Sequence, residues 1–336
     1  MSKKVLFISV PFMSLYRDVI EELNRQGYEV TYLQDCHLPH NFYDIHKRRP
    51  NSFEIFLQGR IHKRYWKKQI RECQSDFVFD ILLVIDGFSL VNSGFLEYLE
   101  QKNPMIKKVL YLFDRTYNNY LFDLIFKSFH QVYSFDLQDC KYYGLKLLPI
   151  YWVPTTSSVK KIDVFGFGTY MPNRYILFDY VNNLTKGTQL VTIIKLYLNE
   201  YPNTLRFKIR KLIKGGLCPD NVYKSSLITH QTIPPCEFRK MLSESKIVLD
   251  SHDIVQDGLT ARFMWALGSG AKIVTTNSAV RHYPFYDEHQ IAIFDVENPY
   301  VSKEFLTSEY VVDDNKRRVI DQYRIDNWIR TLLSTL

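Results

Sequence analysis

The stretch from Lys246 to Asn277, KIVLDSHDIVQDGLTARFMWALGSGAKIVTTN, constrains the fold more than any other part of the chain. Its apolar run at 247–249 predicts a short buried strand that ends at Asp250. A polar loop with one glycine follows, and apolar residues at three- and four-residue spacing then predict a helix with one buried stripe. A second apolar run at 271–275 predicts another strand. Strand, loop, helix and strand together predict a βαβ unit of a parallel sheet, with a right-handed crossover.

The loop before this helix carries residues that indicate a ligand. Gly258 allows close approach of the backbone to a bound group, and the N–H groups at the start of the helix attract anions. Arg262, one turn into the helix, adds a charge that does not titrate near neutral pH. Because open sheets bind ligands beyond the carboxyl ends of their strands, these residues predict a phosphate or diphosphate site. A glycine before a helix is also common in units that bind nothing at this turn.

Strands alternate with helices along the whole chain, which predicts an α/β protein with helices on both faces of parallel sheets. The apolar runs predict strands at 4–10, 28–34, 81–85, 107–113, 131–135 and 145–152, then at 163–168, 190–197, 226–233 and 291–294. The patterns between them predict helices at 14–26, 53–74, 93–102, 119–129, 137–143, 174–186, 202–214 and 235–244. We therefore predict two successive Rossmann-like domains facing a central cleft.

Pro149 and Pro154 mark the linker between the predicted domains. The first domain is predicted over 1–152 and the second over 153–315. A terminal helix is predicted over 316–336, where it can pack back toward the first domain.

The composition indicates a soluble or peripheral protein with a large core, because 46% of the residues are hydrophobic. Five scattered cysteines without C-x-x-C spacing are typical of reduced thiols, so we expect a cytoplasmic location. The apolar N-terminus lacks the cleavage site of a signal peptide, and no stretch approaches the ~20 apolar residues of a membrane span.

Positive charge is concentrated between residues 47 and 71, where one acidic residue, Glu54, accompanies nine basic ones. The basic residues are Lys47, Arg48, Arg49, Arg60, Lys63, Arg64, Lys67, Lys68 and Arg71. Such a run suits the inner face of the cell membrane or an anionic acceptor, although a solvated helix face is the equally plain interpretation. A smaller basic cluster lies between Arg206 and Lys214.

Several cofactor motifs are missing. The G-x-G of Gly166 and Gly168, followed by Thr169, has Met171 where a dinucleotide fingerprint requires a third glycine. There is no Walker loop, no Asp-x-Asp pair and no His or carboxylate cluster at metal-ligand spacing. We therefore expect no bound cofactor and no metal, so that backbone N–H groups and side chains must neutralise a phosphate.

Three segments carry a resemblance to a known family. YLFDRTYNNY at 111–120, YSFDLQDCKYYG at 133–144 and QDGLTARFMWALGSGAKIVTTN at 256–277 resemble the CgeB-like transferases of bacterial surface-polysaccharide loci. The two-domain pattern likewise resembles the GT-B architecture of glycosyltransferases. In the family, the helix position of Trp265 is usually Glu, in an R-x-x-E-A-L-G arrangement, and that acid can hold the ribose or sugar of the donor. The chain departs from the family at this residue.

The resemblance implies that a sugar moves from a nucleotide-activated donor to a saccharide or lipid-linked acceptor in capsule or lipopolysaccharide synthesis. The nucleotide sugar is then a substrate. The candidate residues for binding the donor and its phosphates are Gly166, Gly168, Thr169, Gln256, Gly258, Leu259, Thr260 and Arg262. The candidate nucleoside slot is at Ile233 and Pro234, before the predicted helix at 235–244.

An inverting transfer also needs a base in the first domain. Asp114 and Asp86 each follow a predicted strand there. Asp114 is the preferred base, because it lies in a segment that resembles the family and is followed by residues that can bind hydroxyls. Asp86, beside Gly87, is the second candidate, and helix capping is the commoner role for either side chain.

Two other classes of function remain open. The chain could bind a nucleotide sugar or polysaccharide without catalysis, as the partner of another transferase. Nucleic-acid binding is disfavoured, because the basic run at 60–71 contains only two aromatic residues, Tyr65 and Trp66.

Overall fold

The structure is a computed structural model that describes residues 2–36, 52–72, 77–91, 93–116, 125–155, 159–199 and 219–334. The chain divides into two compact units. Unit 1 comprises Met1–Ile150 and Ile325–Leu336, and unit 2 comprises Tyr151–Arg324. The predicted helix at 202–214, most of the predicted helix at 119–129 and the first three basic residues of the 47–71 run lie outside the described residues.

Unit 1 holds a six-stranded sheet of order β2-β1-β3-β4-β5-β6, in which all paired strands are parallel. Its strands are β1 (Lys4–Ser9), β2 (Glu29–Gln34), β3 (Ile81–Ile85), β4 (Lys107–Leu112), β5 (Gln131–Ser134) and β6 (Lys146–Leu147). Its helices are α1 (Leu15–Arg25), α2 (Ser52–Glu72), η1 (Phe88–Leu90), α3 (Phe95–Lys102), α5 (Leu137–Tyr143) and α13 (Ile325–Leu333). The strand predicted at 145–152 is therefore much shorter than expected.

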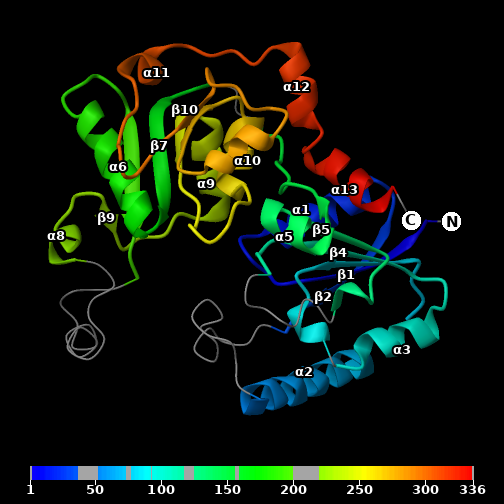
Figure 1. Ribbon diagram of the computed structural model, residues 1–336. Helices are drawn as coiled ribbons and strands as arrows, with labels where there is room; N and C mark the ends of the chain where they lie inside the picture. The colour runs from blue at the N-terminus through cyan, green and yellow to red at the C-terminus, as the bar shows by residue number, and fades with distance from the viewer. Residues whose placement is uncertain are drawn as a thin grey trace. The chain divides into compact units, whose positions relative to one another are not determined.

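Unit 2 holds a second six-stranded parallel sheet, of order β12-β11-β10-β7-β8-β9. Its strands are β7 (Ile162–Thr169), β8 (Thr192–Tyr197), β9 (Ile228–Thr229), β10 (Ser245–Asp250), β11 (Lys272–Thr275) and β12 (Ile291–Ile293). Its helices are α6 (Pro172–Thr185), α8 (Asp220–Tyr223), α9 (Pro235–Ser243), α10 (Ala261–Gly268), η2 (Ser278–His282), α11 (Lys303–Thr307) and α12 (Asp314–Asp321). Figure 1 shows α9 and α10 side by side in this unit, and the two helices are in contact.

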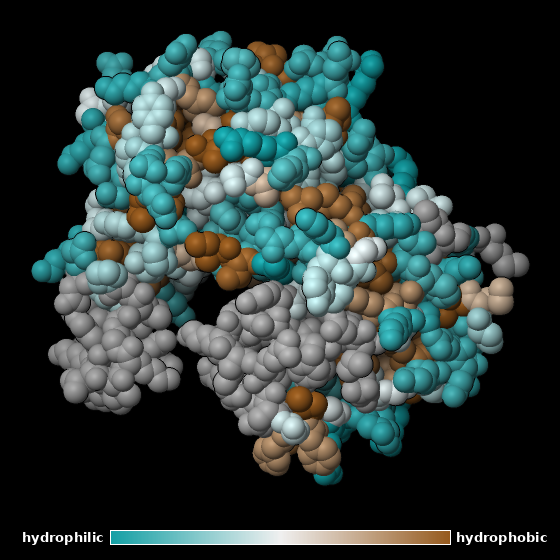
Figure 2. Space-filling model, viewed as in Figure 1, coloured by the Kyte–Doolittle hydropathy of each residue, from teal (hydrophilic) through white to brown (hydrophobic). Residues whose placement is uncertain are grey.

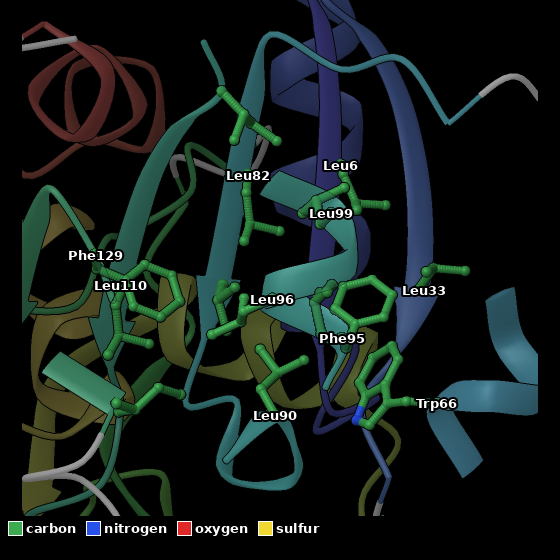
Figure 3. Packing of buried hydrophobic residues seen from close by; sticks show 14 of the residues in the cluster. Leu6, Leu33, Trp66, Leu82, Leu90, Phe95, Leu96, Leu99, Leu110 and Phe129 are labelled. Carbon is green, nitrogen blue, oxygen red and sulfur yellow. The ribbon is translucent and has the colours of Figure 1, made fainter. Parts of the chain in front are cut away.

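The predicted α/β class with two Rossmann-like domains is confirmed, since each unit has its own parallel sheet. The central strands read as continuous apolar runs because both faces of a parallel sheet are covered. In unit 1, Figure 3 shows the leucines of β1, β3 and β4 packed with those of α3. Trp66 of α2 is fully buried, with its ring centroid 4.5 Å from that of Phe95, so one side of the basic helix belongs to the core.

Helix α13 belongs to unit 1 although it follows all of unit 2 in the sequence. It contacts α1, and the Gln26 side-chain amide donates to the Asp326 carbonyl at 3.0 Å. Trp328 is fully buried, with its ring centroid 4.8 Å from that of Tyr111, and its indole N–H donates to the Pro149 carbonyl at 3.1 Å. The end of the chain therefore completes the core of unit 1.

The single helix predicted over 316–336 is instead two helices, α12 and α13. Trp152 accounts for the interruption. Its backbone N–H donates to the Tyr323 carbonyl at 3.0 Å, and its indole N–H donates to the Ile320 carbonyl at 3.0 Å. The Ile320 carbonyl also accepts from the Tyr323 N–H at 3.0 Å, and the Asp321 carbonyl accepts from the Arg324 N–H at 3.1 Å, so bonds between residues three apart end α12 where Trp152 binds. Unit 2 accordingly extends to Arg324, beyond the predicted boundary at 315.

No helix among the described residues is both long enough and apolar enough to cross a membrane. On the face shown in Figure 2, hydrophilic colour covers much of the surface of the described residues, and hydrophobic colour is gathered in smaller areas.

Candidate functional site

Helix α10 begins at a side-chain cap. The Thr260 hydroxyl accepts a hydrogen bond from the Phe263 N–H at 3.1 Å, which satisfies one of the free N–H groups of the first turn. The same hydroxyl donates to the Asp250 carboxylate at 2.6 Å. The helix therefore begins at Ala261, three residues after Gly258. Leu259 itself is buried and anchors the preceding loop in the core.

Asp250, the last residue of β10, joins three elements of unit 2. Its carboxylate is buried and also accepts from the Arg262 guanidinium at 3.1 Å and from the Thr275 hydroxyl at 3.2 Å. The end of β10, the end of β11 and the first turn of α10 thus share one carboxylate. Because a buried carboxylate is costly unless it is paired and hydrogen-bonded, these contacts fix the position of Arg262.

The loop between β10 and α10 is held by Asn277, which follows β11. The Asn277 side-chain amide donates to the carbonyls of Asp257 at 3.0 Å and Gly258 at 3.2 Å. Near the start of the loop, the Gln256 N–H closes a turn on the Asp253 carbonyl at 2.9 Å. The predicted loop residues therefore lie on a fixed backbone beside the first turn of α10.

A second arginine, Arg174 in the first turn of α6, reaches the same place. Its guanidinium donates to the Thr169 carbonyl and, at 2.9 Å, to the Ser251 carbonyl. Gly168 makes room for both arginines. A Cβ atom there would lie 2.8 Å from the Arg262 guanidinium and 3.0 Å from that of Arg174. We call Arg174 and Arg262 the arginine pair.

One arginine of the pair has a carboxylate hydrogen-bond partner among the described residues, and the other does not. Arg262 is paired with Asp250, whereas Arg174 donates to two carbonyls and to no carboxylate in the described part of the chain. Burial and the charge of Arg262 lower the pKa of Arg174 to about 9, and burial also lowers the pKa of Arg262. The Nε atom of each arginine is buried without a hydrogen-bond partner among the described residues. An anion with several oxygens would accept hydrogen bonds from both guanidinium groups and offset their charge.

The other predicted donor residues are placed differently. Gly166 lies inside β7, where a Cβ atom would come within 3.1 Å of the Phe178 ring, so packing of α6 explains this glycine. Ile233 and Pro234 lie in the turn before α9. No hydrogen bond among the described residues joins that turn to the arginine pair.

Trp265, where the resembling family has Glu, projects from α10 toward α9. Its ring centroid lies 6.4 Å from that of Phe238, and the Arg239 guanidinium lies 4.4 Å from the centre of its ring. The side chain is 6% exposed. It therefore forms part of the contact between the two helices.

In unit 1, Asp86 and Asp114 are neighbours at the carboxyl ends of β3 and β4. Asp86 is buried in a left-handed conformation with φ 64°, which Asp adopts more readily than most residues. It accepts from the Phe113 N–H at 2.8 Å. Burial, followed by the negative charge of Asp114, raises the pKa of Asp86 well above its usual range. Asp114 is exposed, so its side chain can meet a solute.

A third carboxylate, Asp35, follows β2 and was not predicted. It is buried, and it accepts from the Cys36 N–H at 2.8 Å and from the Ser89 hydroxyl. Burial raises its pKa to about 6, and its negative charge contributes to the raised pKa of Asp86. Three acids from three successive strands therefore share one edge of the unit 1 sheet.

Among the described residues, no group of three or more His, Cys, Asp or Glu side chains has an arrangement that could hold a metal ion.

Sequence reasoning did not predict Arg174, Asp250 or Asp35 as site residues. A signal for Arg174 was present, because a basic residue in the first turn after G-F-G-T lies where a phosphate would bind. Asp250 ends its strand, and Asp35 follows one, much as Asp86 and Asp114 follow theirs. The sequence does not show which of these acids turn inward.

No protein-family profile matches the sequence, and a search of curated proteins found no match. Solved structures share its fold. AviGT4, a glycosyltransferase of avilamycin A biosynthesis, is similar with a TM-score of 0.53 and 12% identity, over 99% of each chain. A UDP-N-acetylglucosamine 2-epimerase also has a TM-score of 0.53 at 12% identity, over 99% of this chain and 95% of its own.

An α-glucosyltransferase in complex with UDP and a 13-mer DNA has a TM-score of 0.50 at 13% identity, over 98% of this chain and 94% of its own. At such low identity the likeness concerns the fold alone. The chain has the GT-B architecture, built from two Rossmann-like domains, and these enzymes share it.

Proposed function

We propose that this chain is a glycosyltransferase that moves a sugar from a nucleotide-activated donor to a saccharide or lipid-linked acceptor in bacterial surface-polysaccharide synthesis. The arginine pair carries this proposal. The two guanidinium groups meet at the carboxyl ends of β7 and β10, beside the N-terminus of α10, where Arg262 is paired with the Asp250 carboxylate. Diphosphate is the common anion that suits two adjacent guanidinium groups and a helix N-terminus.

The proposed reaction uses the two units for different steps. The arginine pair binds the donor diphosphate. When the bond between the sugar carbon and the phosphate oxygen breaks, the electron pair leaves with the nucleoside diphosphate, and the arginines stabilise its charge. The acceptor hydroxyl forms the new bond to the same carbon and gives its proton to Asp114. Asp86, whose pKa is raised, is the second candidate for this proton.

The donor's nucleoside is assigned to the turn at Ile233 and Pro234, and the reaction is proposed to need no cofactor and no divalent metal. Trp265 replaces the acid that would hold the ribose in the resembling family. A side chain wedged between α9 and α10 offers no carboxylate to sugar hydroxyls, so the donor contacts at this point differ from the family's.

A panel of nucleotide sugars tests the proposal. A donor present at about 100 times its Kd stabilises the folded protein by ~2.7 kcal/mol, so the bound nucleotide is identified by its thermal shift. The selected donor is then incubated with lipid-linked and free saccharide acceptors, and both the glycosylated acceptor and the free nucleoside diphosphate are measured. Failure of every nucleotide sugar to shift the melting temperature would contradict the proposal.

A nucleotide-sugar epimerase is the second candidate, because an epimerase shares the fold at the same TM-score as a glycosyltransferase. Product analysis separates the two. An epimerase converts the donor into its epimer without an acceptor, whereas a transferase consumes the donor only when an acceptor is present. Donor binding without either product would support a non-catalytic nucleotide-sugar-binding partner.

Helix α2 supports a further part of the proposal, association with the inner face of the cell membrane. Phe53 and Phe56 are 71% and 59% exposed at its start, and the Arg60 guanidinium lies 5.7 Å from the centre of the Phe56 ring. The exposed basic residues of the helix are Arg60, Lys63, Arg64, Lys67, Lys68 and Arg71. Figure 2 shows hydrophobic colour at the lower margin, where α2 lies in Figure 1. Exposed aromatic and basic residues together suit an anionic lipid surface.

Vesicle co-sedimentation tests this association. Binding is expected to rise with the fraction of anionic lipid and to fall with salt. The double variant Lys63→Gln, Lys67→Gln is expected to lose ~2 kcal/mol of binding free energy, about 1 kcal/mol for each charge. The exposed pair Lys102→Gln, Lys141→Gln is the control, because it removes the same charge from other helices of unit 1. Equal binding to neutral and anionic vesicles would identify α2 as a solvated helix face.

A further inference from the structure

Unit 2 contains a cavity of about 340 Å³ that the proposed reaction does not use. Trp152, Lys160, Arg239, Leu242, Trp265 and Gly268 are among the residues that line it. Its volume is at the small end of the ~300–1,000 Å³ that is usual for small-molecule sites, which suits a ligand of about monosaccharide size.

The cavity and the arginine pair lie at opposite ends of α10. Gly268, which lines the cavity, is the last residue of the helix, and Leu242 is near the end of α9. Lys160 comes two residues before β7 begins, so the cavity is at the amino ends of the strands. The arginine pair is at their carboxyl ends. Arg262 and Gly268 are six residues apart in α10, about 9 Å at 1.5 Å per residue, and Trp265 lies midway between them.

Two indole rings belong to the apolar part of the cavity lining, together with aliphatic residues such as Leu242. The ring of Trp152 lies directly on Gly268, where a Cβ atom would come within 2.3 Å of it. Its indole N–H is already bound to the Ile320 carbonyl, so this ring is fixed in place. The ring of Trp265 is held between Phe238 and Arg239. Flat, rigid rings of this kind suit the apolar face of a sugar or another planar group.

The charged side chains that line the cavity are both cations, Arg239 and Lys160. The Lys160 ammonium donates to the carbonyls of Ser243 and Ser269, each at 3.0 Å, at the ends of α9 and α10. Arg317 donates to the Gly268 carbonyl at 2.8 Å. Lys160 and Arg317 therefore offset the negative ends of the two helices, and Arg239 is the other cation of the lining. Burial, followed by the charge of Arg317, lowers the pKa of Lys160 to about 8.

Trp265 provides an independent indication of a ligand. Its side chain is 6% exposed, and its indole N–H is buried without a hydrogen-bond partner among the described residues. An unsatisfied buried donor costs ~1–3 kcal/mol, so an acceptor atom in the cavity would be stabilising. The cavity therefore suits a ligand with an oxygen acceptor for the Trp265 N–H, and its cationic lining suits a ligand with an anionic group.

We propose that this cavity is a second binding site, separate from the arginine pair, for a small anionic sugar. The sugar ring stacks against Trp152 and Trp265, a ring oxygen or hydroxyl accepts from the Trp265 indole N–H, and the anionic group binds Arg239 and Lys160. A sugar phosphate and a uronic acid share this chemistry.

Calorimetric titration of the full chain tests the site with four probes: glucose 1-phosphate, glucuronate, glucose and inorganic phosphate. We expect one or both anionic sugars to bind at least tenfold more tightly than glucose or phosphate alone. Preference for glucose 1-phosphate or for glucuronate identifies the anionic group. If neither anionic sugar binds, or if phosphate alone binds as tightly, the proposal is wrong.

Matched variants locate the bound sugar. Arg239→Gln should weaken binding at least tenfold, and Trp265→Phe, which keeps an aromatic ring but removes the N–H donor, should weaken it several-fold. Lys240→Gln is the control, because Lys240 is the next residue of α9 and is exposed. Wild-type affinity in folded Arg239→Gln and Trp265→Phe would overturn the assignment.

The separation from the arginine pair is tested with UDP. Saturating UDP should not displace the sugar, and Arg262→Ala should leave its affinity unchanged. Displacement by UDP, or loss of sugar binding in folded Arg262→Ala, would place the anion at the arginine pair instead. These measurements do not depend on transfer activity, so they can fail while the proposed function stands, and the reverse also holds.

Discussion

The carboxyl ends of the two sheets carry opposite charges. In unit 1, Asp35, Asp86 and Asp114 follow three successive strands, and burial raises the pKa values of the first two. In unit 2, burial lowers the pKa values of Arg174 and Arg262. Both edges therefore hold side chains whose charged forms are destabilised by their surroundings.

In both units the candidate functional residues lie at the carboxyl ends of parallel strands. The few residues that follow each strand determine whether the site is acidic or basic. An edge of carboxylates suits proton transfer, and an edge with two guanidinium groups suits a leaving diphosphate. Perturbed pKa values of this kind are common at functional sites. Each unit can be tested separately, because a substitution of the unit 1 acids should leave UDP binding unchanged, and a substitution in the arginine pair should leave the unit 1 acids in place.

The largest expected effect is at the carboxyl ends of the unit 1 strands, where Asp35, Asp86 and Asp114 lie; we call this the acidic edge. Asp114→Asn keeps the shape of the side chain but removes the proton acceptor, so turnover should fall ~10²–10⁴-fold. Affinity for UDP should not change, since the arginine pair is untouched. Asp86→Asn should lower turnover by a smaller factor. Turnover and UDP binding are measured for both variants.

The outcomes of this experiment are distinct. Near-normal turnover in Asp114→Asn with loss in Asp86→Asn would exchange the two roles. Activity in both variants would mean that the base lies elsewhere or that the reaction retains stereochemistry.

The second effect is at the carboxyl ends of the unit 2 strands, where the arginine pair lies; we call this the basic edge. Arg262→Ala and Arg174→Ala should each weaken UDP binding by about 1.5–3 kcal/mol, the value of a charge-assisted hydrogen bond. This corresponds to roughly 10–150-fold in Kd. The control is Lys186→Ala, an exposed residue just after the other end of α6.

Circular dichroism must accompany these measurements, because Arg262→Ala leaves Asp250 without its charged partner. Arg174 has no carboxylate partner in the described part of the chain, so its variant is the cleaner test. Wild-type UDP affinity in a folded Arg174→Ala protein would remove this arginine from the donor site.

The third effect is on stability. Burial raises the pKa of Asp35 from an ordinary 3.8 to about 6 in the folded protein. The unfolded chain therefore loses this proton first as pH rises, and between about pH 4 and pH 6 the folded protein loses stability. The loss is at most ~3 kcal/mol, at 1.36 kcal/mol for each pH unit. Asp35→Asn, which does not titrate, should show a smaller fall in melting temperature over this range.

Asp287 of unit 2 is the opposite case. Burial acts to raise its pKa, but hydrogen bonds from Lys316, the His289 N–H and Tyr310 lower it to about 2. Its contribution to stability is present above pH 4 and is lost as pH falls toward 2. Asp287→Asn should therefore remove stability at neutral pH.

If Asp35→Asn and wild type melt in parallel from pH 4 to pH 6, the raised pKa of Asp35 is excluded.

The smallest expected effect is that of a chelator. Because guanidinium groups are proposed to neutralise the diphosphate, turnover should be unchanged within error when EDTA is added. Complete loss of transfer in EDTA, restored by manganese or magnesium, would show that the basic edge is not sufficient.

Most of the fold could be predicted from the sequence, because the βαβ pattern is local. The strand that ends at Asp250, the cap at Thr260 and the helix with Arg262 lie within 13 consecutive positions, 250–262. Their spacing is sufficient to place them together. The pairing of Arg174 with Arg262 could not be predicted in this way. It requires β7 to lie beside β10, although β8 and β9 come between them in the sequence.

The two remaining differences also depend on distant contacts. Gly166 reads as a ligand-binding glycine, but the Phe178 ring occupies the space beside it. The pattern at 316–335 reads as one helix, but Trp152 binds the carbonyls at its middle. A local pattern cannot indicate which of its groups a distant residue will contact.

The return of α13 to unit 1 has a consequence for the order in which the protein is made. Residues 325–333 supply Trp328 to the core of unit 1, yet the ribosome adds them after all of unit 2. All of unit 2 is therefore synthesised before the last helix of unit 1 is available. During synthesis the α1 surface that later receives α13 is uncovered, and this surface is where we expect a chaperone to bind the nascent chain.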